Sequence, residues 1–324
     1  MAGTPGLGPI SPDLARSRMA VSPGLGPSRP GLGPSRLVSA RLGWSRPVSA
    51  RLGPPRPVSA GLGRAAPPGS AVARSLADVR PDPLAPLLEL PGVADGVTAT
   101  RTSVDRLLNN RTLRRRSADV SAESSLRGAR AAAALSGVDV ALEDVRSGAA
   151  VTDPVLQGAL RAYAAIPALA DTWTHAPRQA LARLHALAAA DLVEDRDALG
   201  RPAGGAAERL DTLAAVLDAT SAPAAVVAGI VHGELLSLDA FAPASGVVAL
   251  AAVRLTLIDR GLDPKSLVVL EVGHRELGAA YPEALAGYRS GTPQGIGGWL
   301  THCADAIVAG VAETTAICEA IARG

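Results

Sequence analysis

The sequence predicts an all-α fold over residues 75–324, preceded by a disordered low-complexity tail over residues 1–74. From Ser75 onward, apolar residues recur at helical spacing, and Gly, Pro, Asp and Ser mark the breaks between segments. Strand signals are scarce. Only 2% of the residues are aromatic, so alanine and leucine have to fill the core. These observations favour one helical domain.

Nine helices are predicted along this domain. In chain order they cover residues 84–90, 104–135, 154–168, 178–192, 205–220, 223–238, 246–260, 282–290 and 295–322. Pro154, Pro177 and Pro223 stand at predicted helix starts, where the missing N–H of proline costs nothing. Two further apolar segments, 137–145 and 267–272, fit either a short strand or a turn, and they are too few to build a sheet.

The tail over residues 1–74 is repetitive. A seven-residue unit fills residues 24–36, and a ten-residue unit follows with Arg36, Arg46 and Arg56 in register. These units are too short for a solenoid, and a segment so rich in Pro and Gly cannot bury enough apolar surface to offset its ordering entropy. It is either a functionless extension, with initiation near Val72, or a basic arm that contacts anionic surfaces.

Charge is divided unequally between the two parts of the chain. The tail holds ten arginines and one acidic residue, whereas the rest of the chain holds 22 basic and 29 acidic residues. The folded part is therefore mildly acidic and offers no obvious face for a phosphate backbone, so we expect no nucleic-acid binding from it. The sequence leaves open whether the chain binds a protein partner.

Cysteine usage and hydropathy bear on the compartment. Cys303 and Cys318 lie on one predicted helix, about 22 Å apart along its axis, and cannot pair with each other there. Free thiols suit a reducing compartment, and the start of the chain lacks the apolar region of a secretory signal. The longest apolar stretches, 222–231 and 246–258, are too short or are interrupted by Arg254. We expect a cytoplasmic protein without membrane contact.

Several common site motifs are excluded. His232-Gly233-Glu234 matches half of a zinc deaminase signature, but no Cys-x-x-Cys follows it, and the other histidines show no ligand spacing. The sequence therefore predicts no metal site. The Gly-x-Gly runs do not follow buried strands, which argues against dinucleotide binding. The single lysine, Lys265, follows no glycine-rich loop, which excludes a P-loop.

Two passages carry a family resemblance. The first is Glu123-Ser124-Ser125-Leu126-Arg127-Gly128, and the second runs from Pro223 through the loop 239–246 to Arg260. Together they resemble the inhibitory helix and the helix–loop–helix core of the Fic (Fido) family of nucleotidyl and phosphoryl transferases. The resemblance implies a Fic-like helical core over residues 84–310.

In that family the loop reads His-x-Phe-x-Asp-Gly-Asn-Gly-Arg-x-x-Arg, and its residues serve phosphate transfer as base, metal ligand, backbone anion site and cations. Here Asp239 stands at the histidine, Pro243 at the acid, and Val247 and Leu250 at the arginines. Phe241 and Gly246 match the family pattern. Phe241, Ser245 and Gly246 are the candidate loop and anion-site residues, with Phe241 expected to anchor the loop in the core.

Asp239 is the candidate catalytic position, but an aspartate is a poor general base at neutral pH. His232 lies two turns earlier, about 10 Å away along the helix, and cannot replace it. We expect Asp239 to be a turn or capping residue and His232 to be a core histidine with a backbone partner.

At the inhibitory-helix position Arg127 replaces the family glutamate and Gly128 is retained. Leu250 stands at the position of the arginine that this glutamate would pair with, so both charged residues of the inhibitory salt bridge are absent. One interpretation is that nothing remains to be restrained. The other is that Arg127 reaches into the pocket and supplies the lost cation to a phosphate-bearing ligand.

Three hypotheses follow for the function. The first is a Fic-like protein that has lost nucleotidyl transfer and acts as a binding or regulatory module, with no cofactor. The second is a divergent transferase that uses ATP and Mg²⁺ to modify a protein hydroxyl. The third is a helical oligomerisation module that associates through residues 295–322, whose apolar face consists of Ile307, Val308, Val311, Ala312, Ile317 and Ile321.

Overall fold

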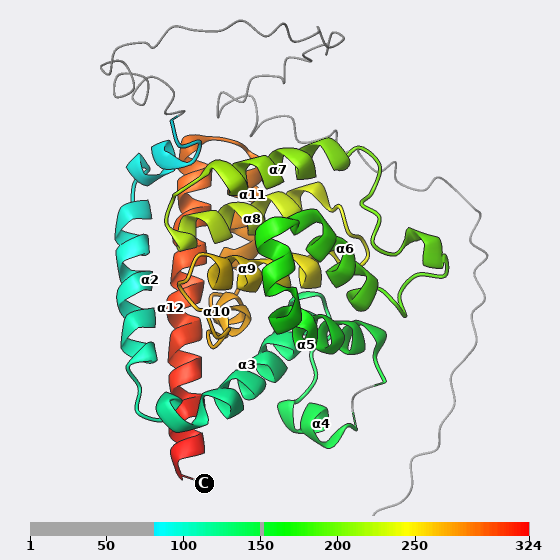
Figure 1. The fold of residues 1–324 in the computed structure, drawn as a ribbon, viewed down its shortest axis with the longest axis vertical. Helices are drawn as coiled ribbons and strands as arrows, with labels where there is room; N and C mark the ends of the chain where they lie inside the picture. Colours follow the sequence, from blue (N-terminus) through cyan, green and yellow to red (C-terminus); the bar gives the residue numbers. More distant parts are fainter. Residues whose placement is uncertain (1–80, 150–151, 324) are drawn as a thin grey trace, which may run out of the picture. The chain divides into compact units, whose positions relative to one another are not determined.

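In the computed structural model, residues 81–149 and 152–323 are described, and the tail predicted for residues 1–74 lies outside them. The described residues contain helices and no strand, as the sequence predicts (Figure 1). The elements are η1 (Ala85–Glu89), α2 (Val93–Leu108), α3 (Leu113–Leu135), α4 (Leu142–Ser147), α5 (Pro154–His175), α6 (Pro177–Ala188), η2 (Arg196–Ala198), α7 (Ala207–Ala219), α8 (Ala224–Leu238), α9 (Ser245–Asp259), α10 (Leu270–Glu276), α11 (Ala280–Arg289) and α12 (Pro293–Arg323).

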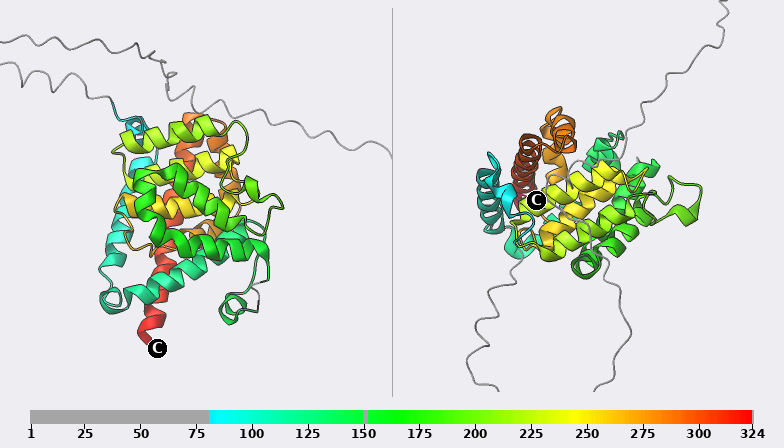
Figure 2. Two further views of the ribbon diagram at one scale, coloured as in Figure 1. Left: turned by 45° about the vertical axis from the view of Figure 1, so that its right-hand side comes forward. Right: turned by 90° about the horizontal axis from the view of Figure 1, so that it is seen from above.

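The centre of the fold is the pair α8 and α9, which pack on each other (Figures 1 and 2). Both helices are apolar on nearly all sides, which is the pattern of a helix surrounded by others. The helices α5, α6 and α3 pack against α9, and the long α12 packs against α8. On its other sides α12 contacts α2, α10 and α11. The loop between α8 and α9 is therefore carried by the two most buried helices.

Helix starts follow the sequence signals. Asp153 caps α5, since its carboxylate accepts hydrogen bonds from the backbone N–H groups of Val155 and Leu156 at 2.8 and 3.2 Å. Proline stands at the first turn of α5 and α6 and just before α8, as predicted. The bounds predicted for α8 and α9 agree with the structure to within one residue.

The single helix predicted over residues 104–135 is wrong. The structure has two helices here, because residues 109–112 form a turn in which the Asn110 side chain accepts a hydrogen bond from the backbone N–H of Thr112 at 2.9 Å. Asparagine favours such turns over continued helix. In the opposite sense, α5 continues past Pro167 to His175, beyond its predicted end, and buries Leu169 and Trp173.

The ambiguous segment 267–272 also resolves. Residues 267–269 are buried without a strand partner, and their backbone N–H groups bond instead to the Asp263 carboxylate and the Thr314 hydroxyl. The short helix α10 follows directly and was not predicted. In the described residues, no helix is both long and apolar enough to cross a bilayer.

Two glycines test how tightly α12 is packed. A Cβ at Gly273 in α10 would overlap the carbonyl of Ala306 in α12, whereas a Cβ at Gly298 in α12 would meet no atom within 4 Å. We expect Gly273→Ala to destabilise the protein by about 1–3 kcal/mol through overpacking. Gly298→Ala is expected to stabilise it by up to about 1 kcal/mol through helix propensity. Urea unfolding of both variants checks this, and equal effects would contradict the packing described.

Candidate functional site

The loop between α8 and α9 begins at Asp239, which ends α8 with a left-handed backbone (φ 46°). Aspartate is among the few residues other than glycine that adopt this conformation readily. The Asp239 side chain is exposed. Its place in the structure is the C-terminal cap of α8, in agreement with its expected role as a turn residue.

Phe241 anchors the middle of the loop. Its side chain is buried, and its ring lies 5.3 Å from the ring of His185 in α6. His185 in turn accepts a hydrogen bond at Nδ1 from the backbone N–H of Gly200, at 3.1 Å. Burial lowers the pKa of His185, although a hydrogen bond with the backbone of Ala242 opposes this. With Nδ1 as acceptor, the neutral ring carries its proton on Nε2, so His185 connects two loops and is not a free base.

The N-terminus of α9 is occupied by protein groups. The Ser245 hydroxyl is buried and accepts the backbone N–H of Phe241 at 3.1 Å, which closes the loop on itself. A Cβ at Gly246 would lie 3.1 Å from the hydroxyl of Ser136, at the end of α3. The structure thus brings Phe241, Ser245 and Gly246 together, but the end of α3 lies against the helix terminus where a phosphate would bind.

The two arginine positions of the family loop also face protein. Val247 and Leu250 are 2% and 1% exposed and belong to the hydrophobic core. Two open pockets of about 340 and 320 Å³ flank the loop, lined on the loop side by Ala240, Ala242 and Phe241. Ser245 and Gly246 line neither of these two pockets. Each of the two pockets is also lined by one arginine, Arg201 in the first and Arg178 in the second, and neither arginine belongs to α9.

The next turns of α9 hold a buried ion pair. Arg254 donates two hydrogen bonds to Glu271 of α10, at 2.6 and 2.8 Å, and a third to the hydroxyl of Ser124 in α3 at 3.2 Å. Tyr163 of α5 donates to the same carboxylate at 2.9 Å. Gly128 leaves the space for this pair, because a Cβ there would overlap the Arg254 guanidinium. Gly128, which matches the glycine of the family's inhibitory-helix segment, thus has a packing role here.

Arg127 points elsewhere. It donates to Glu123 at 2.7 Å and to Glu313 of α12 at 2.6 Å, and it lines a pocket of about 280 Å³ with Arg130 and Arg275. Ser136, which touches the start of α9, lies nine residues further along α3, or about 13 Å along the helix. The structure does not bring Arg127 to the loop, which argues against its replacing a loop arginine.

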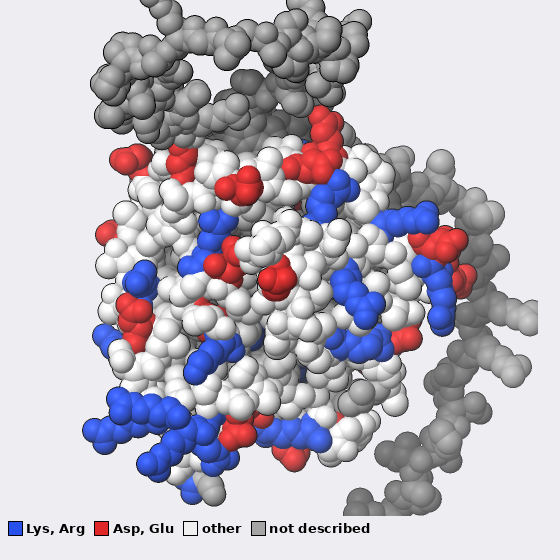
Figure 3. All heavy atoms as spheres, in the orientation of Figure 1, with Lys and Arg blue, Asp and Glu red and all other residues white. Residues whose placement is uncertain are grey.

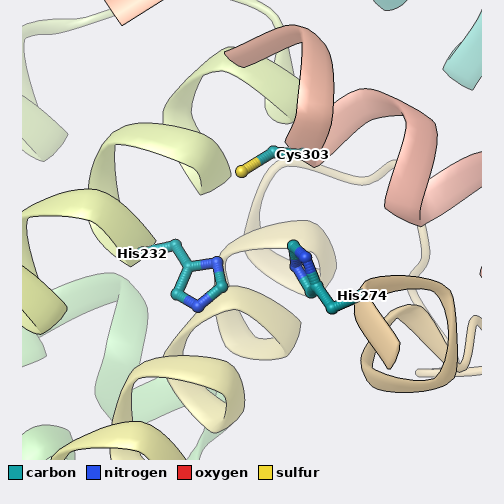
Figure 4. Close-up of side chains that lie close together, drawn as sticks. All are labelled: His232, His274 and Cys303. Carbon is teal, nitrogen blue, oxygen red and sulfur yellow. The ribbon is translucent and has the colours of Figure 1, made fainter. Parts of the chain in front are cut away.

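A second cluster of reactive side chains, which the sequence did not predict, lies inside the domain. His232 of α8, His274 of α10 and Cys303 of α12 place their ligand atoms within 4.8 Å of one another (Figure 4). His232 is a core histidine, as expected, but the partner of its Nε2 is the side-chain hydroxyl of Tyr281, at 3.0 Å, and not the expected backbone group. The three residues are far apart in the sequence, so spacing could not reveal them.

Burial governs the protonation of this cluster. It lowers the pKa of His232 to about 3, with a smaller contribution from His302, and it lowers the pKa of His274 well below its usual value. Burial also raises the pKa of the Cys303 thiol well above its usual range. At neutral pH the cluster is therefore uncharged in the absence of a ligand.

Charge on the surface is also uneven. The corner where α2 meets α3 exposes Arg106, Arg111, Arg114, Arg115 and Arg116, and Figure 3 shows basic side chains gathered there. Leu108, also exposed at this corner, is 37% accessible. The net charge of the folded part is negative, so it gave no sign of this local excess of arginine. A net charge is a sum over the whole domain and does not show where the charges lie.

Comparison with known proteins agrees with the architecture. No protein-family model matches the chain, and no curated protein matches its sequence. Among solved structures, the fold is similar to the crystal structure of a Fic family protein from Desulfovibrio desulfuricans G20, with a TM-score of 0.56 and 18% sequence identity. The match covers 69% of this chain and 75% of that chain. The described part of this chain therefore has an all-α, Fic-like fold.

Proposed function

We propose that the protein is a Fic-fold binding module that does not transfer nucleotides. The observation that carries this proposal is the burial of Val247 and Leu250 at the two positions where the family loop has arginines. Cations at these positions would offset the charge of a triphosphate, and apolar side chains packed in the core cannot do so. The loop keeps its shape through Phe241 and Ser245 while its reactive groups are absent.

The remaining loop groups support the same proposal. Asp239 is exposed at the end of α8, and Pro243 has no side-chain oxygen to hold a metal ion. His185, which lies beside the loop, uses Nδ1 to accept a hydrogen bond from the Gly200 N–H. Phosphoryl or nucleotidyl transfer requires a base, a metal ligand and a cation at one point, and within the described part of the chain these groups do not meet at this loop.

The two alternative functions have less support. A divergent transferase would need an open α9 N-terminus, but Ser245 bonds within the loop and Ser136 lies against Gly246. An oligomerisation module would need a free apolar face on α12, but Ile307, Val311 and Ile317 of the predicted face are buried within the chain. Val308 and Ile321 are half-buried, and the small Ala312 is exposed. These contacts favour a binding role over both.

A transfer assay tests the loss of activity. The full chain is incubated with ATP labelled at the α-phosphate, Mg²⁺ and a protein extract, beside a Fic protein that has an intact loop. We expect label on protein in the reference reaction and none above background with this chain. Incorporation of label that disappears in an Asp239→Ala variant would contradict the proposal and favour the divergent transferase.

For the binding role, the arginine corner between α2 and α3 is the best candidate surface. It combines several exposed positive charges with the exposed apolar side chain of Leu108. Arg116 is paired with Asp119 on the surface, and the pair is half exposed. Such a surface complements a protein partner that presents an acidic segment with an apolar side chain at its end. The arginines would pair with the acidic groups, and Leu108 would contact the apolar side chain.

The corner is tested with a fluorescent glutamate-rich peptide. We expect binding that weakens as salt is raised, and at least a roughly tenfold loss of affinity when Arg114 and Arg115 are both changed to glutamate. The double variant Arg196→Glu, Arg201→Glu, at exposed positions in and just after η2, carries the same change of charge as a matched control and should have a small effect. Equal losses in both variants would show that only net charge is sensed, and the corner would not be a specific surface.

A further inference from the structure

The cluster of His232, His274 and Cys303 has the geometry of a metal site. The three residues come from α8, α10 and α12, all three are buried, and their ligand atoms lie within 4.8 Å of one another. Figure 4 shows one ring nitrogen of His232 and the sulfur of Cys303 directed toward the space beside His274. A bound ion would draw the three atoms in by about 1 Å, because metal–nitrogen and metal–sulfur bonds are about 2.0–2.3 Å long.

A small cavity lies between these atoms. Its volume is about 10 Å³, and its walls are completed by apolar groups from Ala228, Gly229, Val253, Leu270 and Ile307. This space is about that of one small sphere, which suits a single ion or one water molecule. Either occupant would contact the same three polar atoms, so titration with metal is what separates an ion from a water.

Each histidine has an outer partner that orients its ring. The Tyr281 hydroxyl lies 3.0 Å from Nε2 of His232, and Nε2 of His302 lies 3.0 Å from Nδ1 of His274. These contacts occupy one nitrogen of each ring and leave Nδ1 of His232 and Nε2 of His274 for the centre. Outer partners of this kind fix tautomer and orientation at metal-binding histidines.

Metal binding at this cluster would release one proton. Neutral imidazole and thiolate are the forms that bind metal, so binding replaces the S–H bond of Cys303 by a sulfur–metal bond and releases that proton to solvent. No oxidant or reductant takes part in this step.

The ligand set and its surroundings select among metals. One thiolate and two imidazoles suit soft or borderline ions, and no carboxylate is among the residues that line the cavity in the described chain. A monovalent ion bound by one thiolate makes a neutral complex, whereas a divalent ion leaves a buried positive charge. Three ligands without a fourth also suit copper(I) better than zinc, which prefers four.

We propose that His232, His274 and Cys303 form a buried three-ligand site for a d¹⁰ transition-metal ion, with copper(I) as the best-fitting occupant. The site lies inside the domain and is independent of the loop between α8 and α9. It stands whether or not the protein transfers nucleotides, and its test does not depend on any activity.

The test titrates the metal-free full chain with copper(I) against a chromophoric chelator, under reducing conditions, and separately with Zn²⁺. We expect one equivalent of metal with an X-ray absorption spectrum of one sulfur and two nitrogen ligands. Tighter binding of copper(I) confirms the assignment of the ion, and tighter binding of Zn²⁺ confirms the site with the divalent ion. Binding of neither ion overturns the proposal.

Variants show whether these residues are the ligands. Cys303→Ser and His274→Gln are expected to abolish stoichiometric binding, and Tyr281→Phe to weaken it by about 10- to 100-fold through the orientation of His232. Cys318→Ala, at the second buried cysteine of α12, is the matched control and should bind as the unaltered protein does. Circular dichroism and thermal unfolding establish that each variant is folded. Equal loss in Cys303→Ser and Cys318→Ala, or full binding in a folded Cys303→Ser, contradicts the proposal.

Discussion

Replacing Glu271 by alanine is expected to lower the free energy of unfolding by about 3–5 kcal/mol. The carboxylate is fully buried and receives hydrogen bonds from Arg254 and Tyr163, so its removal leaves the Arg254 charge in the core without its main partner. Coulombic attraction and hydrogen bonding to Glu271 together raise the pKa of Arg254, although burial opposes this, so the guanidinium stays charged. A buried charge without its counter-ion is far more costly than a lost surface contact.

The experiment is urea unfolding of Glu271→Ala and Glu271→Gln beside the native chain. Glu271→Gln keeps the shape of the side chain and removes its charge, so it should also destabilise strongly. Asp105→Ala breaks the exposed Arg101–Asp105 pair on α2 and serves as the control, with an expected effect of less than about 1 kcal/mol. A similar small effect at both positions would show that the buried pair does not hold α3, α9 and α10 together.

Acid is expected to destabilise the protein from about pH 6.5 downward. Below this pH the buried histidines bind protons in the unfolded chain but stay neutral in the folded protein. Burial lowers the pKa of His232 to about 3 and lowers the pKa values of His274 and His302. Their folded pKa values lie below the unfolded value near 6.5, so their contribution to stability is complete above that pH and is lost as the pH falls. Each histidine that stays neutral adds a slope of about 1.4 kcal/mol per pH unit.

Unfolding by urea at several pH values between 7.5 and 4.5, with a metal chelator present, measures this slope. His232→Asn should reduce the slope, and His175→Gln, at an exposed position on α5, should leave it unchanged. Asp82, whose pKa is lowered to about 2, loses its contribution only at more acidic pH and so does not confuse the result. Constant stability down to pH 5 would contradict the buried neutral histidines.

Much of the architecture was predictable from local pattern. The apolar runs of α8 and α9 predicted their bounds to within one residue, and the prolines at the first turn of α5 and α6 and just before α8 predicted where these helices start. The break at Asn109 and Asn110 was missed, since helical periodicity continues across it and only the side-chain turn at Asn110 ends the helix. The helix α10 was missed because the backbone before it bonds to side chains, to Asp263 four residues earlier and to Thr314 on α12, and hydrophobic periodicity shows neither bond.

The candidate sites were less predictable. The substitutions in the loop could be identified from the sequence alone. The close approach of Ser136 to Gly246 could not, because it depends on how α3 packs against α9. Arg254 indicated a buried ion pair, because an arginine within an apolar helix requires an acidic partner. The sequence does not show that this partner is Glu271. The cluster of His232, His274 and Cys303 depends wholly on tertiary structure, since three separate helices bring it together.

The most direct test of the central claim, that the loop no longer handles nucleotides, is calorimetric titration of the full chain with ATP in the presence and absence of Mg²⁺. A Fic protein with an intact loop serves as the positive control under the same conditions. With Val247 and Leu250 in the core and Ser136 against the start of α9, the expected result is no heat of binding at millimolar ATP. Saturable binding that requires Mg²⁺ would contradict the claim and would show that a phosphate site persists in this loop.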